Sequence, residues 1–371
     1  MKFTVTTSEL LRSLSRVHGV VPTKSTSPIL ENILFDLLND VLTITATDMD
    51  ISLAVTMQVK GEQDGRIAIP AKRLLDTVRA LPEISMTFFI DVTGNKIQIS
   101  TGNGEYHLTG EGAKDYPPLP QFKGKEQLII DTAMLKKLIH RTAFAVSADE
   151  LRPAMMGVLL QSSGMEIRAV ATDGHRLVRY IQKLPGPSGV TRDIIIPAKA
   201  LTLIGRSLEG TENTMTISET HLRITFERST LVARLIDETY PNYESVIPQD
   251  NTKVMTVRRE EMVASLRRVA LYASATTHQV KLEMGKGLVN VSAQDVDFGG
   301  EARETVPCEY ADDPLEIGFN SIYLIDILTH LDDERVSFRF STPTRAGIVT
   351  PTTAAGAEDV MMLVMPVRLN A

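Results

Sequence analysis

Two pairs of aspartates, each pair interrupted by one residue, are the first candidates for chemistry in this chain. Asp48 and Asp50 form one pair, and Asp295 and Asp297 form the other. Carboxylates at this spacing can hold divalent cations, and together with the stretch Asp173-Gly174-His175-Arg176 they suggest a metal-dependent nuclease or phosphoesterase. The alternative is that the aspartates are turn residues, which accept hydrogen bonds from backbone N–H groups between strands.

The recurrence of these aspartates favours the turn explanation. Thr47-Asp48-Met49-Asp50 returns as Thr172-Asp173-Gly174-His175 and, more loosely, as Gln294-Asp295-Val296-Asp297. The second copy has His175 in place of the paired carboxylate, which argues against a metal site. The sequence also contains no phosphate-binding glycine loop of the Walker type, no nucleophile elbow and no zinc-ligand spacing. We therefore expect no catalytic residue, no metal site and no cofactor.

Two further short patterns recur in the same order as the aspartates. One is Ile69-Pro70-Ala71-Lys72, which returns as Ile196-Pro197-Ala198-Lys199 and, more weakly, as Gly318-Phe319-Asn320-Ser321. The other is Asp115-Tyr116-Pro117, which returns as Thr239-Tyr240-Pro241 and as Val364-Met365-Pro366. Every pattern advances by about 125 residues per copy, so the chain consists of three repeats.

Each repeat must supply the helices and strands that position these turns. Apolar residues at helical spacing predict two helices per repeat, over 8–18, 71–80, 132–144, 198–209, 259–272 and 321–331. Alternating apolar and polar residues predict half-buried strands between the helices, as in 42–47, 96–100, 214–217 and 336–340. The sequence therefore predicts an α+β fold of three repeated domains, each with two helices packed on antiparallel sheets.

The domain boundaries are expected in two proline-rich, polar segments. With 371 residues the chain is too long for one ordinary hydrophobic core. Residues 117–121 and 247–251 have the composition of linkers. We therefore place the three domains at 1–122, 126–248 and 252–371.

The basic residues are distributed unevenly. The formal net charge is −7, which would repel nucleic acid if it were uniform. The predicted helices nevertheless carry a net positive charge, from Arg12, Arg16, Lys72, Arg73, Arg79, Lys136, Lys137, Arg141, Lys199, Arg206, Arg267 and Arg268. Two alternatives are ordinary solvated helix faces and a repeat-built scaffold with no role on DNA. The segregation of basic helices from acidic strands favours a ring that holds DNA phosphates without reading the bases.

The cysteine content and the hydropathy pattern indicate the compartment. Cys308 is the only cysteine, which excludes an internal disulfide and fits a reducing environment. The first residues contain no apolar segment typical of a secretion signal. The most apolar run, over 360–367, is far shorter than the ~20 residues that span a bilayer. We therefore expect a cytoplasmic protein without membrane contact.

Several strings in the sequence resemble the bacterial DNA polymerase III beta clamp family. They are Ala171-Thr172-Asp173-Gly174-His175-Arg176-Leu177, Thr239-Tyr240-Pro241-Asn242-Tyr243, Phe319-Asn320 with Tyr323, and Val364-Met365-Pro366-Val367-Arg368-Leu369. The resemblance spans the whole chain and implies a processivity factor that is not an enzyme. It implies three-domain chains that close head to tail as a homodimer ring around double-stranded DNA. It also implies binding of the replicative DNA polymerase, the clamp loader, and other polymerases and repair proteins.

The resemblance further implies a cleft between the second and third domains that binds a short peptide of each partner. The implied cleft residues are Met155, Thr172, Gly174, His175, Arg176, Leu177, Pro241, Val246, Asn320, Tyr323, Leu363, Val364, Met365, Pro366, Val367 and Arg368. The apolar members suit a hydrophobic pocket, and we expect His175, Arg176 and Asn320 to orient the peptide by hydrogen bonds. Ser245 stands where family members often have a basic residue.

DNA contacts and a dimer seam are expected at further positions. The basic helices and the resemblance together indicate DNA contacts from Lys24, Arg73, Lys136, Lys137, Arg141, Arg152 and Lys199. The resemblance implies that Tyr106 and Leu108 of one chain lie against Leu271 and Tyr272 of the other, with Glu301 and Glu304 nearby. Family members usually have basic residues opposite these glutamates. In this chain other residues stand in their place, around Asn103 and Glu105, so we expect a largely apolar seam.

Overall fold

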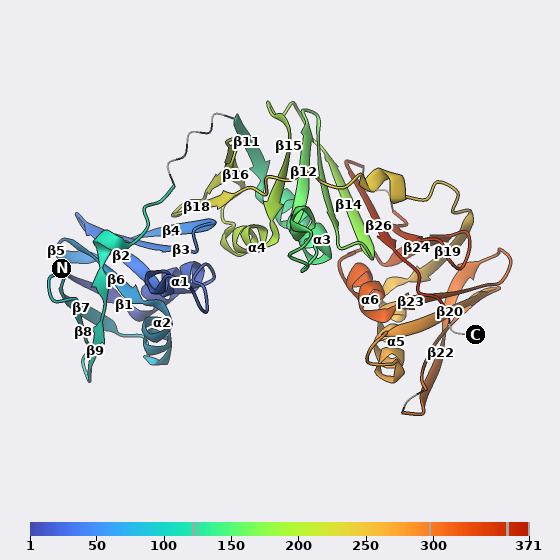
Figure 1. Cartoon of the computed structure of the whole chain (residues 1–371), viewed down its shortest axis with the longest axis horizontal. Coiled ribbons are helices and arrows are strands. Elements are labelled where there is room, and N and C mark those ends of the chain that lie inside the picture. The colour runs from blue at the N-terminus through green and yellow to red at the C-terminus, as the bar shows by residue number, and fades with distance from the viewer. Residues whose placement is uncertain (121, 123, 125, 297, 354–355, 370–371) are drawn as a thin grey trace. The chain divides into compact units, whose positions relative to one another are not determined.

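The computed structural model describes residues 1–120, 122, 124, 126–296, 298–353 and 356–369. Gln121 of the first predicted linker, Asp297 of the second aspartate pair and the last two residues of the predicted third domain lie outside the described residues. The chain divides into two compact units (Figure 1). Unit 1 comprises Met1–Lys136 and Lys199–Leu235, and unit 2 comprises Lys137–Ala198 and Ile236–Ala371.

Six α-helices form within the described residues, two from each repeat, and each overlaps a predicted range. They are α1 (Thr7–His18), α2 (Ala71–Ala80), α3 (Thr132–Thr142), α4 (Ala198–Ser207), α5 (Arg259–Val269) and α6 (Ser321–Thr329). Four of them, α3, α4, α5 and α6, end two or three residues earlier than predicted. After α3 and α5, the 3₁₀ turns η3 (Ala143–Ala145) and η6 (Ala270–Tyr272) continue the chain with tighter geometry. Across this part of the chain, no helix combines the length and the apolarity that a bilayer crossing needs.

Helix α1 illustrates how the sequence pattern produces a helix and its packing. The side chain of Thr6 accepts a hydrogen bond from the Glu9 backbone N–H and caps the first turn. Leu10, Leu14 and Val17 form one fully buried stripe. α1 lies beside α2 in unit 1, as α5 lies beside α6 in unit 2 (Figure 1). The predicted pairs of helices are therefore present in both units.

The strands of unit 1 form two antiparallel sheets. The first has the order β5 (Lys60–Gln63), β1 (Lys2–Thr6), β7 (Ser85–Asp91), β8 (Lys96–Ser100) and β9 (Glu105–Thr109). The second has the order β10 (Glu111–Gly112), β6 (Gly65–Pro70), β2 (Asn32–Leu38), β3 (Val41–Thr47), β4 (Ile51–Gln58), β18 (Ser229–Arg234), β17 (His221–Thr225), β16 (Glu212–Ile217) and β11 (Glu126–Asp131).

The described residues of unit 2 form one antiparallel sheet of twelve strands. Its order is β15 (Thr191–Pro197), β12 (Gly157–Ser163), β13 (Glu166–Thr172), β14 (Arg176–Lys183), β26 (Glu358–Val364), β25 (Gly347–Pro351), β24 (Arg335–Phe340), β19 (Lys253–Arg258), β22 (Gly300–Tyr310), β21 (Leu288–Asp295), β20 (Gln279–Gly285) and β23 (Leu315–Asn320). The predicted combination of helices and antiparallel sheets is confirmed.

The sheets run across the junctions between repeats, which the sequence did not predict. In unit 1, β4 of the first repeat pairs with β18 of the second, from Ile51 opposite Ala233 to Val55 opposite Ser229. In unit 2, β14 of the second repeat pairs with β26 of the third, from Arg176 opposite Val364 to Gln182 opposite Glu358. Main-chain hydrogen bonding across the junction satisfies two strand edges that would otherwise be open.

A buried tyrosine anchors the end of the first repeat. Tyr116 is 5% exposed, and its hydroxyl lies 3.1 Å from the Thr45 carbonyl and 3.3 Å from the Asn32 carbonyl. Tyr240 holds the matching position in the second repeat, where its hydroxyl lies 3.4 Å from the Val170 carbonyl. Burial raises the pKa of Tyr116 to about 12. The recurring Tyr-Pro pattern therefore marks a tyrosine that ties the end of a repeat to its sheet.

Replacing Tyr116 with Phe should lower the free energy of unfolding by about 1 kcal/mol at pH 7, because the buried carbonyls lose their phenolic donor. Because folding raises the pKa of Tyr116 from 10.0 to about 12, its neutral form contributes stability below pH 10 that is lost as the pH approaches 12. Urea titrations of both proteins should therefore show a smaller alkaline loss of stability in the variant. Equal stability at pH 7 would contradict the assigned hydrogen bonds.

Candidate functional site

A groove with a volume of about 780 Å³ opens on the surface of unit 2. Part of its lining is apolar because it includes Leu177 in β14 and Leu363 in β26, which are directly paired across the strands and both buried. Met365 and Val246 also line the groove, and they remain 40% and 53% exposed. A concave surface with accessible apolar side chains is suited to receive apolar groups of another molecule.

Most of the predicted cleft residues come together in this groove. Those that line it are Met155, Thr172, Gly174, His175, Arg176, Leu177, Pro241, Val246, Leu363 and Met365. They come from four separate stretches of sequence, at 155, 172–177, 241–246 and 363–365, which meet at the β14–β26 pairing and the turn after β13. The convergence supports a single binding surface at this position.

The remaining predicted cleft residues do not line the groove. Val364 is fully buried in β26, and the Val367 backbone N–H donates to the Gly318 carbonyl at 2.9 Å. Tyr323 lies behind His175, with ring centroids 5.7 Å apart and the planes nearly parallel. The other three are Asn320, Pro366 and Arg368.

Several groove residues were missed by the sequence analysis. Arg152 lines the groove although it was expected to contact DNA, and Ser245, which was expected beside the cleft, lines it too. The lining residues that were not predicted are Asn242, Tyr243, Ile247, Pro248, Gln249, Asp250, Thr344, Arg345 and Ala346. The segment 247–251 was interpreted as a linker, yet its first four residues line the groove. Tyr243 is buried and Ile247 packs on the same apolar cluster. Tyr243 and Ile247 are four residues apart, and this spacing was the signal that could have indicated packing on the core.

Turns that follow β3 and β13 explain the recurring aspartates. The Asp173 carboxylate accepts hydrogen bonds from the backbone N–H groups of His175 and Arg176, at 2.8 and 2.9 Å. Asp48 accepts from Asp50 and Ile51 in the same way. Gly174 supplies the left-handed backbone at φ +91° that this turn requires. The prediction that these aspartates stabilise turns is confirmed, and among the described residues no cluster of His, Cys, Asp or Glu is arranged to hold a metal ion.

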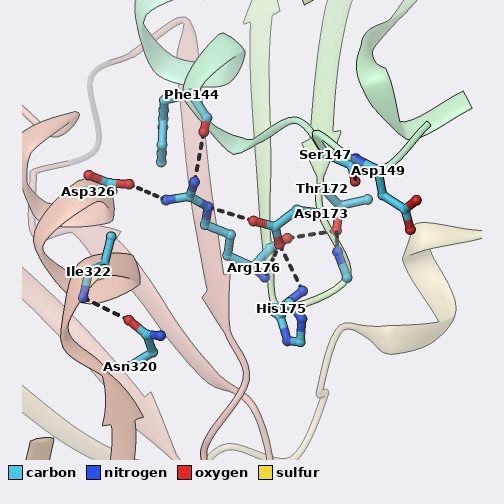
Figure 2. A network of polar contacts seen from close by, with 11 residues as sticks. Phe144, Ser147, Asp149, Thr172, Asp173, His175, Arg176, Asn320, Ile322 and Asp326 are labelled. Atoms are coloured by element: carbon cyan, nitrogen blue, oxygen red, sulfur yellow. Dashed lines mark hydrogen bonds and ion pairs between the residues drawn. The ribbon is translucent and has the colours of Figure 1, made fainter. Parts of the chain in front are cut away.

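Two residues that were expected to orient a bound peptide are occupied within unit 2. The Asn320 side chain accepts from the Ile322 backbone N–H at 2.9 Å and caps α6 (Figure 2). Arg176 is buried and donates to Asp173, Asp326 and the Phe144 carbonyl (Figure 2). Because their polar atoms already have partners, a peptide would have to compete with these contacts to bond either side chain. His175 is exposed and remains available.

The basic residues expected at DNA fall into three groups. Lys24, Arg73 and Lys136 are exposed. Lys137, Arg152 and Lys199 form ion pairs with Glu358, Asp149 and Asp48, respectively. The Arg141 side chain is 3% exposed, pairs with Asp332 at 2.9 Å and donates to the His330 carbonyl. A contact between Arg141 and phosphate would therefore require this buried guanidinium to leave its partners.

The expected seam residues lie on two strands and one short turn. Tyr106 and Leu108 are on β9, which is an edge strand of its sheet, and Leu108 is buried against its own unit. Leu271, in η6, is 81% exposed. Glu304, in β22, forms two 2.7 Å hydrogen bonds with Arg268 of the same chain. These bonds hold the pKa of Glu304 below its ordinary value, so this glutamate has a partner without a second chain.

Comparison with known protein families gives a match over nearly the whole chain. Residues 1–120 match the N-terminal domain of the DNA polymerase III beta subunit, residues 129–242 its central domain, and residues 244–368 its C-terminal domain. The beta sliding clamp of Chlamydia muridarum is 30% identical over 371 residues, covering 100% of both chains. The beta sliding clamp of Pseudomonas aeruginosa is 31% identical over 372 residues, with the same coverage.

Solved structures give the same result for the fold. A sliding clamp from Bartonella birtlesii, bound to griselimycin, superposes with a TM-score of 0.93 at 30% identity. The sliding clamp of Bacillus subtilis superposes with a TM-score of 0.91 at 28% identity. Both comparisons cover 100% of each chain. The similarity therefore extends over all three repeats.

Proposed function

Because the chain belongs to the family of DNA polymerase III beta subunits, the bacterial sliding clamps, we propose that it closes with a second copy into a ring and binds its partners through the groove in unit 2. The family is a non-enzymatic processivity factor, so the chain is a DNA polymerase processivity factor and not a nuclease or phosphoesterase. Its partners are DNA and the replicative polymerase.

The repeat itself supports the homodimer. The strand pairs β4–β18 and β14–β26 join the first repeat to the second and the second to the third. One repeat is about 125 residues, so β14 lies one repeat after β4, and β22 lies one repeat after β14. In the same way, β9 lies one repeat before β18. The missing third junction would therefore pair β22 of one chain with β9 of another, which is a head-to-tail contact.

The two strands needed for this junction have open edges. β9 pairs only with β8 among the described residues. β22 pairs with β21 along 300–307, and its other edge is used by β19 only at 308–310. Open edges attract other strands, and Leu271 and Tyr272 place exposed apolar surface in the same repeat as β22. We propose the seam at Tyr106, Leu108, Leu271, Tyr272, Glu301 and Glu304, and three clamp domains at 1–122, 126–248 and 252–371.

The groove is proposed as the binding site for short peptides of the replicative polymerase, the clamp loader, other polymerases and repair proteins. One observation carries this proposal: five stretches of sequence, at 152–155, 172–177, 241–250, 344–346 and 363–365, meet to form a single groove whose lining includes the paired Leu177 and Leu363. Methionines such as Met155 and Met365 adapt their shape to different ligands, which suits a surface used by many partners. A clamp from C. crescentus has been solved with polyethylene glycol bound to what is described as a putative beta-motif tethering region.

Sequence-independent contact with DNA is proposed for the exposed basic residues Lys24, Arg73 and Lys136. Lys137, Arg152 and Lys199 are proposed as weaker contributors, because each must leave or share a carboxylate partner. Cytoplasmic localisation is proposed because the replicating chromosome of a bacterium lies there.

Changing Met365 or Val246 to Glu should weaken binding of a clamp-motif peptide by roughly tenfold or more, because a charge would be desolvated against apolar peptide side chains. Both side chains are well exposed, so the fold should be retained. Fluorescence anisotropy with a labelled peptide measures the effect. Met165→Glu is the matched control, since Met165 is 57% exposed and does not line the groove. Unimpaired binding in both groove variants would refute the site.

Changing Leu271 to Asp should shift the dimer toward monomer, because the seam would then bury an unpaired carboxylate. Sedimentation velocity measures the distribution of the two species. Leu151→Asp is the control, because Leu151 is the same residue type, is 90% exposed and lies outside the proposed seam. A Leu271 variant that dimerises as tightly as the unmodified chain would count against this placement.

A further inference from the structure

Arg176 lines the groove but directs its polar atoms away from it. Its side chain is 10% exposed. Nε donates to Asp173 at 3.1 Å, Nη1 to Asp326 at 2.5 Å, and Nη2 to the Phe144 carbonyl at 2.9 Å (Figure 2). Each of the three nitrogens of the guanidinium therefore has an oxygen partner inside unit 2. A bound peptide would have to break one of these bonds before it could use Arg176 as a donor.

The same guanidinium also contacts two aromatic rings. Its central carbon lies 5.1 Å from the centre of the Phe144 ring and 4.9 Å from the centre of the Tyr323 ring. Both distances are within the range of favourable cation–π contacts. Arg176 thus joins three elements: the turn after β13, the 3₁₀ turn η3 and the helix α6.

The contacts of Arg176 lead back to the groove through Tyr323. The Tyr323 ring stacks on His175 with a 14° angle between the planes, and His175 lines the groove. The His175 carbonyl accepts from the Met365 backbone N–H at 2.8 Å. Two groove residues, His175 and Met365, therefore depend on where α6 holds Tyr323. Asp326, one turn along α6 from Tyr323, does not itself line the groove.

The opposite side of the network is held firmly. Phe144 stacks on His330 with ring centroids 3.8 Å apart, and His330 contacts His140 at 4.7 Å. Arg141 donates to the His330 carbonyl and pairs with Asp332. The end of α3 and the end of α6 are therefore tied together independently of Arg176. The partners of Arg176 in η3 and α6 are therefore fixed, and Arg176 can hold the turn after β13 in place against them.

We propose that Arg176 is a positioning residue of the groove, which acts through Asp326 and Tyr323 to orient His175 and does not itself bond the partner peptide. The inference rests on the proposed peptide-binding function of the groove. It makes Asp326 a determinant of peptide affinity although Asp326 lies outside the groove. The reason is that a buried guanidinium deprived of a carboxylate partner is strongly unfavourable, so the turn and α6 would shift to relieve it.

The test begins with Asp326→Asn, which keeps the shape of the side chain and removes its charge. Peptide affinity, measured by fluorescence anisotropy, should fall roughly tenfold, the lower end of what the loss of one charge-assisted hydrogen bond would cause. Asp359→Asn is the matched control. Asp359 in β26 forms an ion pair with Arg179 in β14 at 3.0 Å, and neither residue lines the groove. The control should bind as the unmodified chain does.

A second readout reports on His175 without any peptide. Stacking on Tyr323 should displace the His175 ring proton resonance through the ring current, and Asp326→Asn should move it toward the position of an unstacked histidine. A His175→Gln variant assigns the resonance. A change that merely lowered global stability would leave this signal in place in the folded protein.

The outcomes separate this inference from the proposed function. Unchanged peptide affinity in Asp326→Asn, together with strong loss in Arg176→Met, would overturn the positioning role and make Arg176 a direct ligand. An unchanged His175 resonance in Asp326→Asn would overturn it as well. Peptide that binds Met365→Glu as tightly as the unmodified chain would instead refute the groove, and the resonance measurement would still test the positioning of His175.

Discussion

Antiparallel pairing between strands of successive repeats is the interaction on which the rest of the structure depends. An edge strand leaves N–H and C=O groups unpaired, and a chain of repeats must either cover these edges or join them. Here β4 joins β18 and β14 joins β26, so each internal junction is a continuation of a sheet. A third junction of the same kind would pair β22 with β9, and each of these strands has an unpaired edge among the described residues. A second copy of the chain can supply the partner strand. The proposed ring closure would thus use the same kind of contact that already joins the repeats.

The groove depends on the same pairing. The β14–β26 register sets Leu177 directly opposite Leu363, and a slip of one residue would turn these side chains to the other face of the sheet. Around this apolar pair, the Asp173 turn fixes His175, and Arg176 ties the turn to α6 and η3. A site that serves many partners needs an accessible apolar surface on a rigid support. In the proposed site, Met365 and Val246 would provide the surface and the buried Arg176 network the support.

Local features were well predicted from the sequence, and features that depend on distant contacts were not. Helix α2 has the bounds that its apolar periodicity predicts, and Asp48 and Asp173 cap turns as their recurrence indicates. The groove could be predicted only through family resemblance, because no local pattern shows that Leu177 pairs with Leu363. The burial of Arg141 was not predicted, since its position on a helix does not reveal its contacts with Asp332 and His330. The segment 247–251 resembled a linker because most of its residues are polar or proline, and its composition does not show that Ile247 packs on the core.

Topological linkage to DNA tests the central claim most directly. The clamp loader of the same organism would load the protein onto a nicked circular plasmid, and gel filtration would remove unbound protein. The plasmid would then be cut once, and the amount of protein that stays on the DNA would be measured. A closed ring that contacts phosphates without reading bases should remain with the circle and leave through the ends of the linear molecule. Equal retention on circular and linear plasmid would show that the protein binds DNA as a ligand and does not encircle it, and would contradict the account.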